Sequence, residues 1–171
     1  MPIPDDMLPA LRSDHAGETG AVYIYRGILA VTRVPEVMVF ARHHLATEKR
    51  HLEMMSQLLP QEQYSRLLPL WRLAGWMTGM LPALFGPTAV YRTIDAVESF
   101  VDRHYQEQIE QLRARPSHQG LRDLLQGCRD DELQHRDQAR SYLQGPGLVG
   151  RLWVGLVGVG SQAGVYLASR Y

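Results

Sequence analysis

Cysteine is nearly absent from this chain, which has one Cys among 171 residues. A single thiol excludes an intrachain disulfide framework, and it excludes zinc or iron–sulfur sites built only from cysteine. An excess of positive charge is missing too, because 18 Lys and Arg residues balance 18 Asp and Glu residues. The sequence therefore offers no electrostatic surface for a nucleic acid.

Three further absences narrow the function. The opening residues 1–7, MPIPDDM, are short and acidic and lack the apolar core of a signal peptide, so we expect a cytoplasmic chain, or one that has been processed or trimmed. No Gly-rich dinucleotide-binding fingerprint is present, which indicates that there is no Rossmann domain. No stretch alternates between apolar and polar residues with period two, so we predict no sheet.

Proline and glycine divide the chain into segments of helical length. We predict helices at 6–32, 36–58, 88–114 and 117–143, a connection at about 60–87, and an apolar tail at about 148–171 that holds a fifth helix. Residues 1–171 fit one domain. Two short links and one long connection predict two antiparallel hairpins joined by a crossover. The expected fold is an all-α, ferritin-like four-helix bundle with additional apolar helical segments, although other bundles share this layout.

The apolar segments 68–86 and 148–171 are nearly long enough to span a membrane. Arg72, Pro82 and Arg151 interrupt them, and glycines weaken the second as a helix. We interpret both as segments that lie at a membrane interface or line a groove. Ordinary core helices and a single membrane span remain the alternatives.

Carboxylates and imidazoles fall on the apolar stripe of each long predicted helix. Two helices carry Glu-x-x-His in the same phase of the stripe, and each of the other two carries a lone glutamate. These inward residues are Glu18, Glu48, His51, Glu98, Glu132 and His135. Four buried carboxylates would repel one another and raise one another's pKa unless cations joined them. The alternative is that they face solvent or pair with Arg and Lys neighbours.

Metal ions would resolve this conflict, because two divalent cations match four carboxylates and leave the imidazoles neutral. One inward Glu from each of two helices and one Glu-x-x-His from each of the others is the ligand set of di-iron and di-manganese bundles. The similar spacings, Glu18 to Glu48 and Glu98 to Glu132, predict a pseudo-two-fold axis. Ligands alone do not choose between iron oxidation, radical generation, desaturation and hydroxylation.

Six segments that cover nearly the whole chain are more specific than this ligand pattern. They are LRSDHAGETGAVYIYRG (11–27), EKRHL (48–52), LWRLAGWMTG (70–79), AVESFVDRHYQEQI (96–109), RDDELQH (129–135) and VYLASRY (165–171). On these segments the chain resembles the demethoxyubiquinone hydroxylases of ubiquinone biosynthesis. One departure is Pro9, which stands where relatives often carry a basic residue, and it puts a nicotinamide contact there in doubt.

The resemblance implies an oxygen-dependent di-iron monooxygenase that hydroxylates the ring of a demethoxyubiquinone or demethoxyubiquinol. One iron would be held by Glu18, Glu48 and His51 and the other by Glu98, Glu132 and His135, with Glu48 and Glu132 as bridges. O₂ and a reductant, with NADH as a candidate, would be co-substrates. His104 and Tyr105 match the family's His-Tyr pair, and Tyr105 would contact a quinol oxygen unless its role is structural.

The implied location is a membrane surface, because a polyprenyl quinone substrate is insoluble. We expect peripheral binding to the cytoplasmic face of a bacterial inner membrane, or to the matrix face of the mitochondrial inner membrane in a eukaryote. A homo-oligomer or a lipid-binding accessory protein is a further expected partner. The docking surface would comprise Trp71, Trp76, Met77, Met80, Leu81, Leu84, Phe85, Trp153 and Tyr166, unless these residues serve core packing or oligomer contact.

Several neighbours of the ligands have weaker assignments. Asp131 would orient His51 or else lie on the surface, and Gly17 and Gly20 would allow close helix contact or leave room for substrate near Glu18. Asp14 and His15 lie one turn before Glu18 in the same motif. We assign a small core residue to Cys128, and packing or surface positions to His43, His44 and His118.

Two rival functions remain. A ferroxidase or iron-storage protein would use the same ligands, but a soluble storage cage has no need of the apolar connection and tail. A membrane-associated lipid-binding scaffold that keeps a structural metal site is the second rival. It predicts that removing Glu48 abolishes stability and leaves lipid binding intact.

Overall fold

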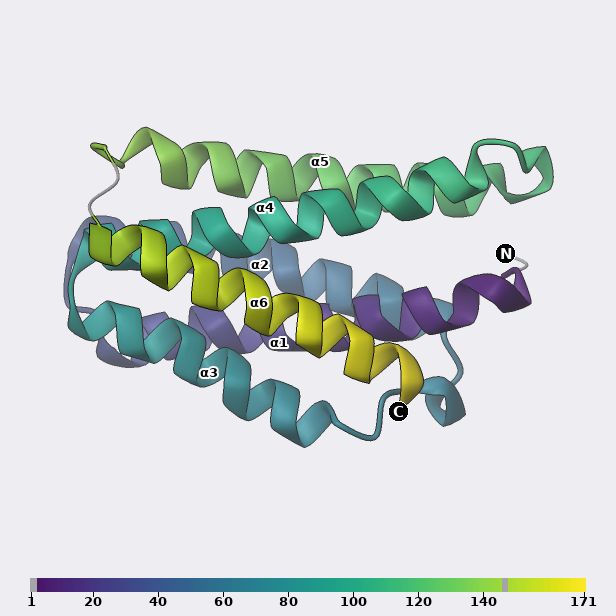
Figure 1. Cartoon of the computed structure of the whole chain (residues 1–171), viewed down its shortest axis with the longest axis horizontal. Coiled ribbons are helices and arrows are strands. Elements are labelled where there is room, and N and C mark those ends of the chain that lie inside the picture. Colours follow the sequence, from purple (N-terminus) through teal and green to yellow (C-terminus); the bar gives the residue numbers. More distant parts are fainter. Residues whose placement is uncertain (1–2, 146–147) are drawn as a thin grey trace.

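Four long helices frame the molecule in the computed structural model, which describes residues 3–145 and 148–171, without the side chains of 148–151. They are α1 (Leu8–Val31), α2 (Pro35–Leu58), α4 (Pro87–Leu112) and α5 (Gln119–Ser141). Helix α1 packs along α2, and α4 packs along α5, as two hairpins (Figure 1). Within the described residues there are only helices and their connections, so the predicted all-α, ferritin-like bundle is confirmed.

Proline fixes where two of these helices begin. Pro35 and Pro87 each occupy the first helical position, where a missing N–H leaves no hydrogen bond unmade. Gly86, immediately before Pro87, has a φ of 94°, a conformation that residues with a Cβ rarely adopt. The sharp end of the crossover therefore depends on the Gly-Pro pair.

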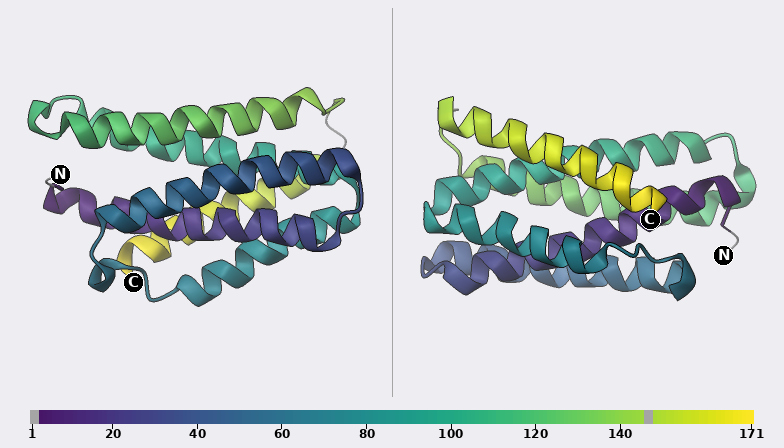
Figure 2. Two further views of the ribbon diagram at one scale, coloured as in Figure 1. Left: turned by 180° about the vertical axis from the view of Figure 1, so that it is seen from behind. Right: turned by 60° about the horizontal axis from the view of Figure 1, so that its bottom comes forward.

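The connection between the hairpins is itself largely helical. After a 3₁₀ turn at Gln61–Gln63, helix α3 (Leu68–Leu84) runs back along α1. Glycines let the two backbones touch: a Cβ on Gly75 would lie 2.3 Å from the carbonyl oxygen of Gly20. Figure 2 shows α3 along the outside of the bundle, below α1 and beside the yellow C-terminal helix.

The C-terminal helix α6 (Leu148–Arg170) crosses α1 and α4 on the face shown in Figure 1. Two polar contacts fix it there: Trp153 Nε1 donates to Thr93 Oγ1 at 2.7 Å, and Arg12 Nη1 donates to the Ser169 carbonyl oxygen at 3.2 Å. Its segment Leu152–Arg170 has the length and composition of a membrane span, and 6% of that window is buried in the protein. The predicted fifth helix is confirmed.

Two apolar clusters fill the bundle. One includes Ile28, Phe40 and Ile94, and the other includes Leu11 and Leu125. Along every long helix the residues of one cluster are separated from those of the other by buried polar residues. The fold thus places a polar layer in the middle of an apolar core.

Candidate metal centre

The polar layer contains all six predicted ligands. Each of them is at most 4% exposed. Helix α1 supplies Glu18, α2 supplies Glu48 and His51, α4 supplies Glu98, and α5 supplies Glu132 and His135. The structure therefore places the predicted residues together in the core, and the alternative that they face solvent is wrong.

The six side chains form two overlapping groups that could each hold a metal ion. In each group one potential ligand atom per residue lies within 4.8 Å of every other. The first group is Glu18, Glu48, His51 and Glu132, and the second is Glu48, Glu98, Glu132 and His135. Glu48 and Glu132 belong to both groups, as expected of carboxylates that bridge two ions.

Glu132 lies at the middle of the hydrogen bonds within the cluster. Its Oε1 is 2.8 Å from His51 Nδ1, and its Oε2 is 3.0 Å from His135 Nδ1. Glu48 Oε1 also lies 3.0 Å from His135 Nδ1, but this contact lacks hydrogen-bond geometry and leaves that oxygen without a partner. Both imidazoles thus turn Nδ1 toward the carboxylates.

Burial and the neighbouring charges shift every pKa in the cluster. Burial raises the pKa of Glu18 and of Glu98, and the other carboxylates raise both further. Burial alone would raise the pKa of Glu132, but hydrogen bonds from both histidines outweigh it and hold that pKa at about 2. Despite burial, which opposes protonation, hydrogen bonding to Glu132 raises the pKa of His51 to about 10 and of His135 to about 11. Without cations the cluster must hold extra protons.

These residues fit a metal pair better than a protonated network. Buried Oε2 of Glu18 and buried Oε1 of Glu48 have no hydrogen-bond partner, although such atoms are costly to leave unpaired. Divalent cations would coordinate these oxygens and replace the protons on the imidazoles. Oxygen and imidazole donors without thiolate suit Fe or Mn.

Asp131 takes the position predicted for it. Its Oδ2 lies 3.0 Å from Nε2 of His51, the nitrogen that faces away from the cluster. A carboxylate that accepts this N–H fixes the ring and its tautomer, and Nδ1 is then left for a metal. The side chain of Asp131 is 40% exposed, so it joins the centre to the surface.

Two tyrosines contact the cluster from opposite sides. Tyr105, on α4, donates its hydroxyl to Glu18 Oε1, and Tyr25, on α1, donates to Glu98 Oε1 at 3.2 Å. Sequence reasoning gave Tyr25 no role. The signal was available, because Tyr25 follows Glu18 by the same seven residues by which Tyr105 follows Glu98.

A second polar cluster lies beside Glu18. Gln108 Nε2 donates to Asp14 Oδ1 at 2.8 Å, and His104 Nε2 lies 3.1 Å from the same oxygen. Ser13 Oγ is also 3.1 Å from His104 Nε2. Burial lowers the pKa of His104, but the hydrogen bond to Asp14 outweighs it, so the net shift is upward.

An apolar cavity leads from this region to the carboxylates. It has a volume of about 360 Å³ and lies between α1, α3, α4 and α6. Glu18, Glu48, Glu98 and Glu132 line its inner end, together with His104 and Tyr105, and its outer walls come from Trp71, Trp153, Leu156, Val157, Gly160 and Val165, among others. The centre is therefore open to an apolar molecule.

The two glycines near Glu18 serve the two purposes suggested by the sequence, which are close packing and room for a substrate. Gly17 lines the cavity, and a Cβ there would meet nothing within 4 Å. Gly20 packs against Trp71, whose Cε3 would lie 3.4 Å from an added Cβ. One glycine thus leaves space, and the other admits a neighbouring side chain.

The remaining histidines lie outside the cluster. His15 stacks on Tyr64, with ring centroids 3.9 Å apart. His44 is buried, and its Nε2 bonds Gln138 Oε1 at 2.7 Å. His43 is exposed and His118 is half-buried. Cys128 is a buried core residue, as predicted, and burial raises the pKa of its thiol.

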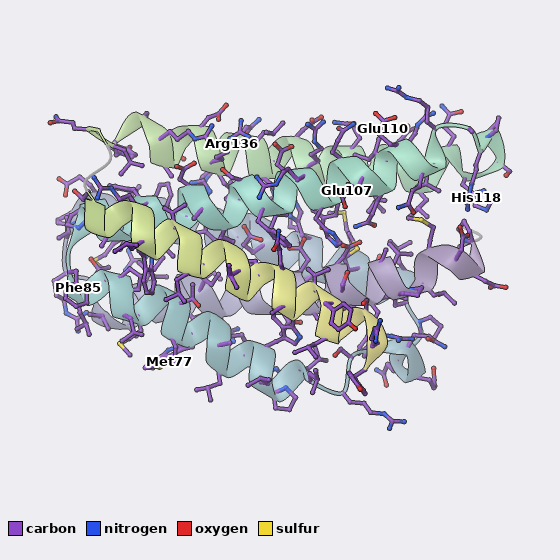
Figure 3. The ribbon with its side chains drawn as sticks, in the orientation of Figure 1. Met77, Phe85, Glu107, Glu110, His118 and Arg136 are labelled. Atoms are coloured by element: carbon purple, nitrogen blue, oxygen red, sulfur yellow. The ribbon has the colours of Figure 1, made fainter. Side chains whose placement is uncertain are left out.

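The nine residues predicted to form a docking surface differ in exposure, and Trp76, Met77 and Met80 are half-buried. Leu81, Leu84, Phe85 and Tyr166 are exposed, Phe85 by 82%. Figure 3 shows Met77 on the outer side of α3 and Phe85 just past the end of that helix. By contrast, Trp71 and Trp153 line the internal cavity and are half-buried. These two rings turn inward, so the expectation that they lie on an outer surface is wrong for Trp71 and Trp153.

The fold and the centre together define a class: ferritin-like helical bundles with a buried carboxylate–imidazole site suited to metal ions. Within that class the chain belongs to the family described as "Ubiquinone biosynthesis protein COQ7", whose pattern matches residues 6–168. This agrees with the resemblance found in the sequence motifs.

Relatives with assigned functions match most of the chain. A Dictyostelium discoideum protein named "NADPH-dependent 3-demethoxyubiquinone 3-hydroxylase, mitochondrial" is 32% identical over 94% of this chain and 75% of its own length. A Rattus norvegicus protein of the same name is 31% identical over 94% and 76%. A Rhodospirillum rubrum protein named "3-demethoxyubiquinol 3-hydroxylase" is 38% identical over 79% and 67%.

Proposed function

We propose that this chain is an oxygen-dependent monooxygenase that hydroxylates the ring of a demethoxyubiquinone or demethoxyubiquinol. The observation that carries the proposal is the juxtaposition of two overlapping four-residue groups with an apolar cavity that ends on their carboxylates. The names of the relatives support the substrate class. One atom of O₂ enters the new C–OH bond and the other leaves as water, with two electrons and two protons supplied by a reductant.

Two iron ions would be held by the six buried residues. Glu18, Glu48 and His51 would bind one ion, and Glu98, Glu132 and His135 the other, with Glu48 and Glu132 shared between them. When bound, the iron pair supplies the redox chemistry that activates O₂ for insertion into the ring.

The chain itself positions the ring and controls protons. The cavity walls exclude water and hold an apolar ring against the carboxylate end. The hydroxyl of Tyr105 keeps Glu18 in place and lies in the cavity wall, where we propose that it also contacts a quinol oxygen. His104, held by Asp14 at the same wall, is the second proposed polar contact for the substrate.

The outer faces of α3 and α6 would hold the protein at a membrane surface. Exposed Leu84, Phe85, Leu152 and Leu156 offer apolar side chains that insert among lipids. We propose peripheral binding on the cytoplasmic face of a bacterial membrane, or the matrix face in mitochondria. A second copy or a lipid-binding accessory protein would cover part of this surface.

A nicotinamide is the proposed source of electrons. The names of the Dictyostelium and rat relatives specify NADPH, whereas the sequence resemblance suggested NADH. Assays with each nucleotide, with and without added quinone, distinguish direct reduction of the centre from relay through the quinone.

An isotope experiment tests the proposed reaction. Iron-loaded protein, reduced anaerobically, is mixed with a short-tailed demethoxyquinol and ¹⁸O₂, and the product is analysed by mass spectrometry. We expect one ¹⁸O atom in the new hydroxyl, no product from the variant Glu48→Ala/His51→Ala, and normal product from the control Glu53→Ala, which changes an exposed residue of α2. Accumulation of many irons per chain without ring oxidation would instead indicate the storage function.

A further inference from the structure

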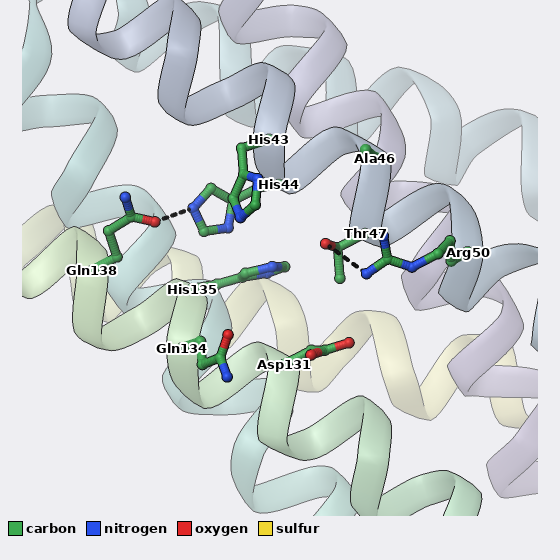
Figure 4. A pocket seen from close by; sticks show the side chains of 9 residues that line it. All are labelled: His43, His44, Ala46, Thr47, Arg50, Asp131, Gln134, His135 and Gln138. Carbon is green, nitrogen blue, oxygen red and sulfur yellow. Dashed lines mark hydrogen bonds between the residues drawn. The ribbon is translucent and has the colours of Figure 1, made fainter.

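A polar pocket reaches the metal centre from the side opposite to the apolar cavity. It has a volume of about 200 Å³ and lies between α2 and α5, which contact each other far less than the helices within each hairpin do. Figure 4 shows its lining, which is His43, His44, Ala46, Thr47 and Arg50 from α2 and Asp131, Gln134, His135 and Gln138 from α5. It shares no lining residue with the apolar cavity.

Residues of the centre form the inner wall of this pocket. His135 lines it directly, and Asp131, whose carboxylate holds His51, lines it as well. The pocket therefore reaches both imidazoles of the centre. It contacts His135 directly, and it contacts His51 through Asp131, the carboxylate partner of that ring. The apolar cavity, by contrast, meets the four glutamates.

His44 provides an independent sign that the pocket accepts a ligand. Its side chain is 1% exposed, and Gln138 Oε1 accepts the hydrogen of Nε2 at 2.7 Å. This tautomer leaves the lone pair on Nδ1, and that buried atom has no hydrogen-bond partner. The pocket thus offers an unpaired imidazole nitrogen from α2 and, at a separate place on α5, the partly exposed carboxylate of Asp131, and both donor types suit a divalent first-row metal ion.

We propose that this polar pocket is the route by which hydrated Fe²⁺ enters the centre, with His44 and Asp131 as transient ligands. The inference rests on the proposed function, because it requires that the six buried residues bind metal. Water occupies about 30 Å³ per molecule in the liquid, so an ion with six waters needs about 180 Å³ and fits a pocket of about 200 Å³.

The apolar cavity is a poor route for the same ion. Polar atoms are sparse along its outer walls, so a divalent cation would lose its hydration without replacement, at a large cost in free energy. In the polar pocket, side-chain oxygens and nitrogens replace water one at a time. The two openings thus separate the ion from the apolar substrate.

Arg50 brings a permanent positive charge to the pocket, and this charge opposes the entry of a cation. Its Nη2 donates to Thr47 Oγ1 at 3.2 Å, and the residue is exposed, so its positive charge lies at the rim of the pocket. Removing this charge in Arg50→Gln is expected to speed loading at low salt. The difference from wild type is expected to vanish at high salt, because mobile ions screen charges near a surface.

A bulky label on one introduced cysteine can block either the polar pocket or the apolar cavity selectively. Cys128 is 1% exposed and burial raises the pKa of its thiol, so it resists labelling. Ala46→Cys places an exposed thiol at the polar pocket. Leu156→Cys places one at the apolar cavity, where Leu156 is 64% exposed. Each variant is compared with and without a bulky maleimide label, so that the unlabelled form is its matched control.

The measurement is the rate at which metal-free protein takes up Fe²⁺ anaerobically, with Co²⁺ absorbance as a second probe. We expect the label on Ala46→Cys to slow uptake by an order of magnitude with the final metal content unchanged, and the label on Leu156→Cys to leave the rate unchanged. Slowing only by the Leu156→Cys label, or equal rates in all forms, would overturn the proposed route and leave the metal centre intact. No uptake by wild type would overturn both.

Discussion

Two tyrosine hydroxyls hold carboxylates of the centre in place. Tyr25 bonds Glu98 and Tyr105 bonds Glu18. Since partners of metal ligands commonly affect metal affinity by about 10–100-fold, Tyr25→Phe is expected to weaken iron binding by about tenfold without unfolding the protein. Competition with a chelator measures this loss. Tyr105→Phe should weaken binding equally, and unchanged affinity in both variants would contradict the assigned role.

Asp131 is expected to matter more than its neighbour in sequence. In Asp131→Asn a neutral amide replaces the negatively charged carboxylate that accepts the His51 N–H, so the ring is held less firmly. Metal affinity should therefore fall by about 10–100-fold. Asp130→Asn is the matched control, because Asp130 is exposed and bonds only Gln126 among the described residues. Isothermal titration of the metal-free proteins compares the two, and equal affinities would refute an orienting role for Asp131.

The contact between Asp14 and His104 predicts a dependence of stability on pH. Because the pKa of His104 is raised in the folded protein, the protonated ring stabilises the fold fully below the unfolded value of 6.5, and this contribution is lost as pH rises through the folded value. His104→Gln should therefore lower the free energy of unfolding by roughly 1–2 kcal/mol under acidic conditions and by less at alkaline pH. Urea titrations across pH test this, and a constant difference would contradict it.

Local patterns predicted the ligands but only part of their surroundings. The two Glu-x-x-His pairs can be recognised from the sequence alone, because residues that share one face of a helix recur every three or four positions. The contact from Tyr25 to Glu98 joins α1 to α4, and such a contact depends on how two helices cross. Only the pseudo-two-fold spacing hinted at it.

The contact between α1 and α3 depends on glycine. A Cβ on Gly79 would lie 1.9 Å from the carbonyl oxygen of Ile24, a backbone atom that moves only if the helices separate. Gly79→Ala is thus expected to destabilise the protein by about 1–3 kcal/mol, the usual cost of overpacking. Gly158→Ala, in α6, is the control, because a Cβ there meets nothing within 4 Å. Thermal unfolding of both variants tests the contact, and equal melting temperatures would contradict it.

The bounds of the helices were predictable because proline and glycine mark them, but the directions of some side chains were not. Tyr142 follows His135 by seven residues, a spacing that puts it on the same helical stripe, yet it is 50% exposed, because it lies just past the last residue of α5 and stacks on Tyr91. Trp71 was expected on the docking surface, yet it fits between Gly20 and Gly164. Apolar character does not reveal which apolar environment a ring will occupy.

The molecule as a whole separates two kinds of access to one buried centre. An apolar cavity beneath α3 and α6 faces the proposed membrane side, and a polar pocket between α2 and α5 opens elsewhere. Both end on residues of the same polar layer, which lies between two apolar clusters. This arrangement favours metal in the layer, because four buried ionised carboxylates without cations would destabilise the bundle.

Metal content per chain is the most direct test of this account. Protein from iron-supplemented cells is analysed by mass spectrometry beside Glu48→Ala/His51→Ala and the control Glu53→Ala. We expect about two irons per chain in wild type and in the control, and one or fewer in the double variant. Wild-type protein that binds neither iron nor manganese, even after anaerobic reconstitution, would contradict it, and the six buried residues would then be a protonated polar network.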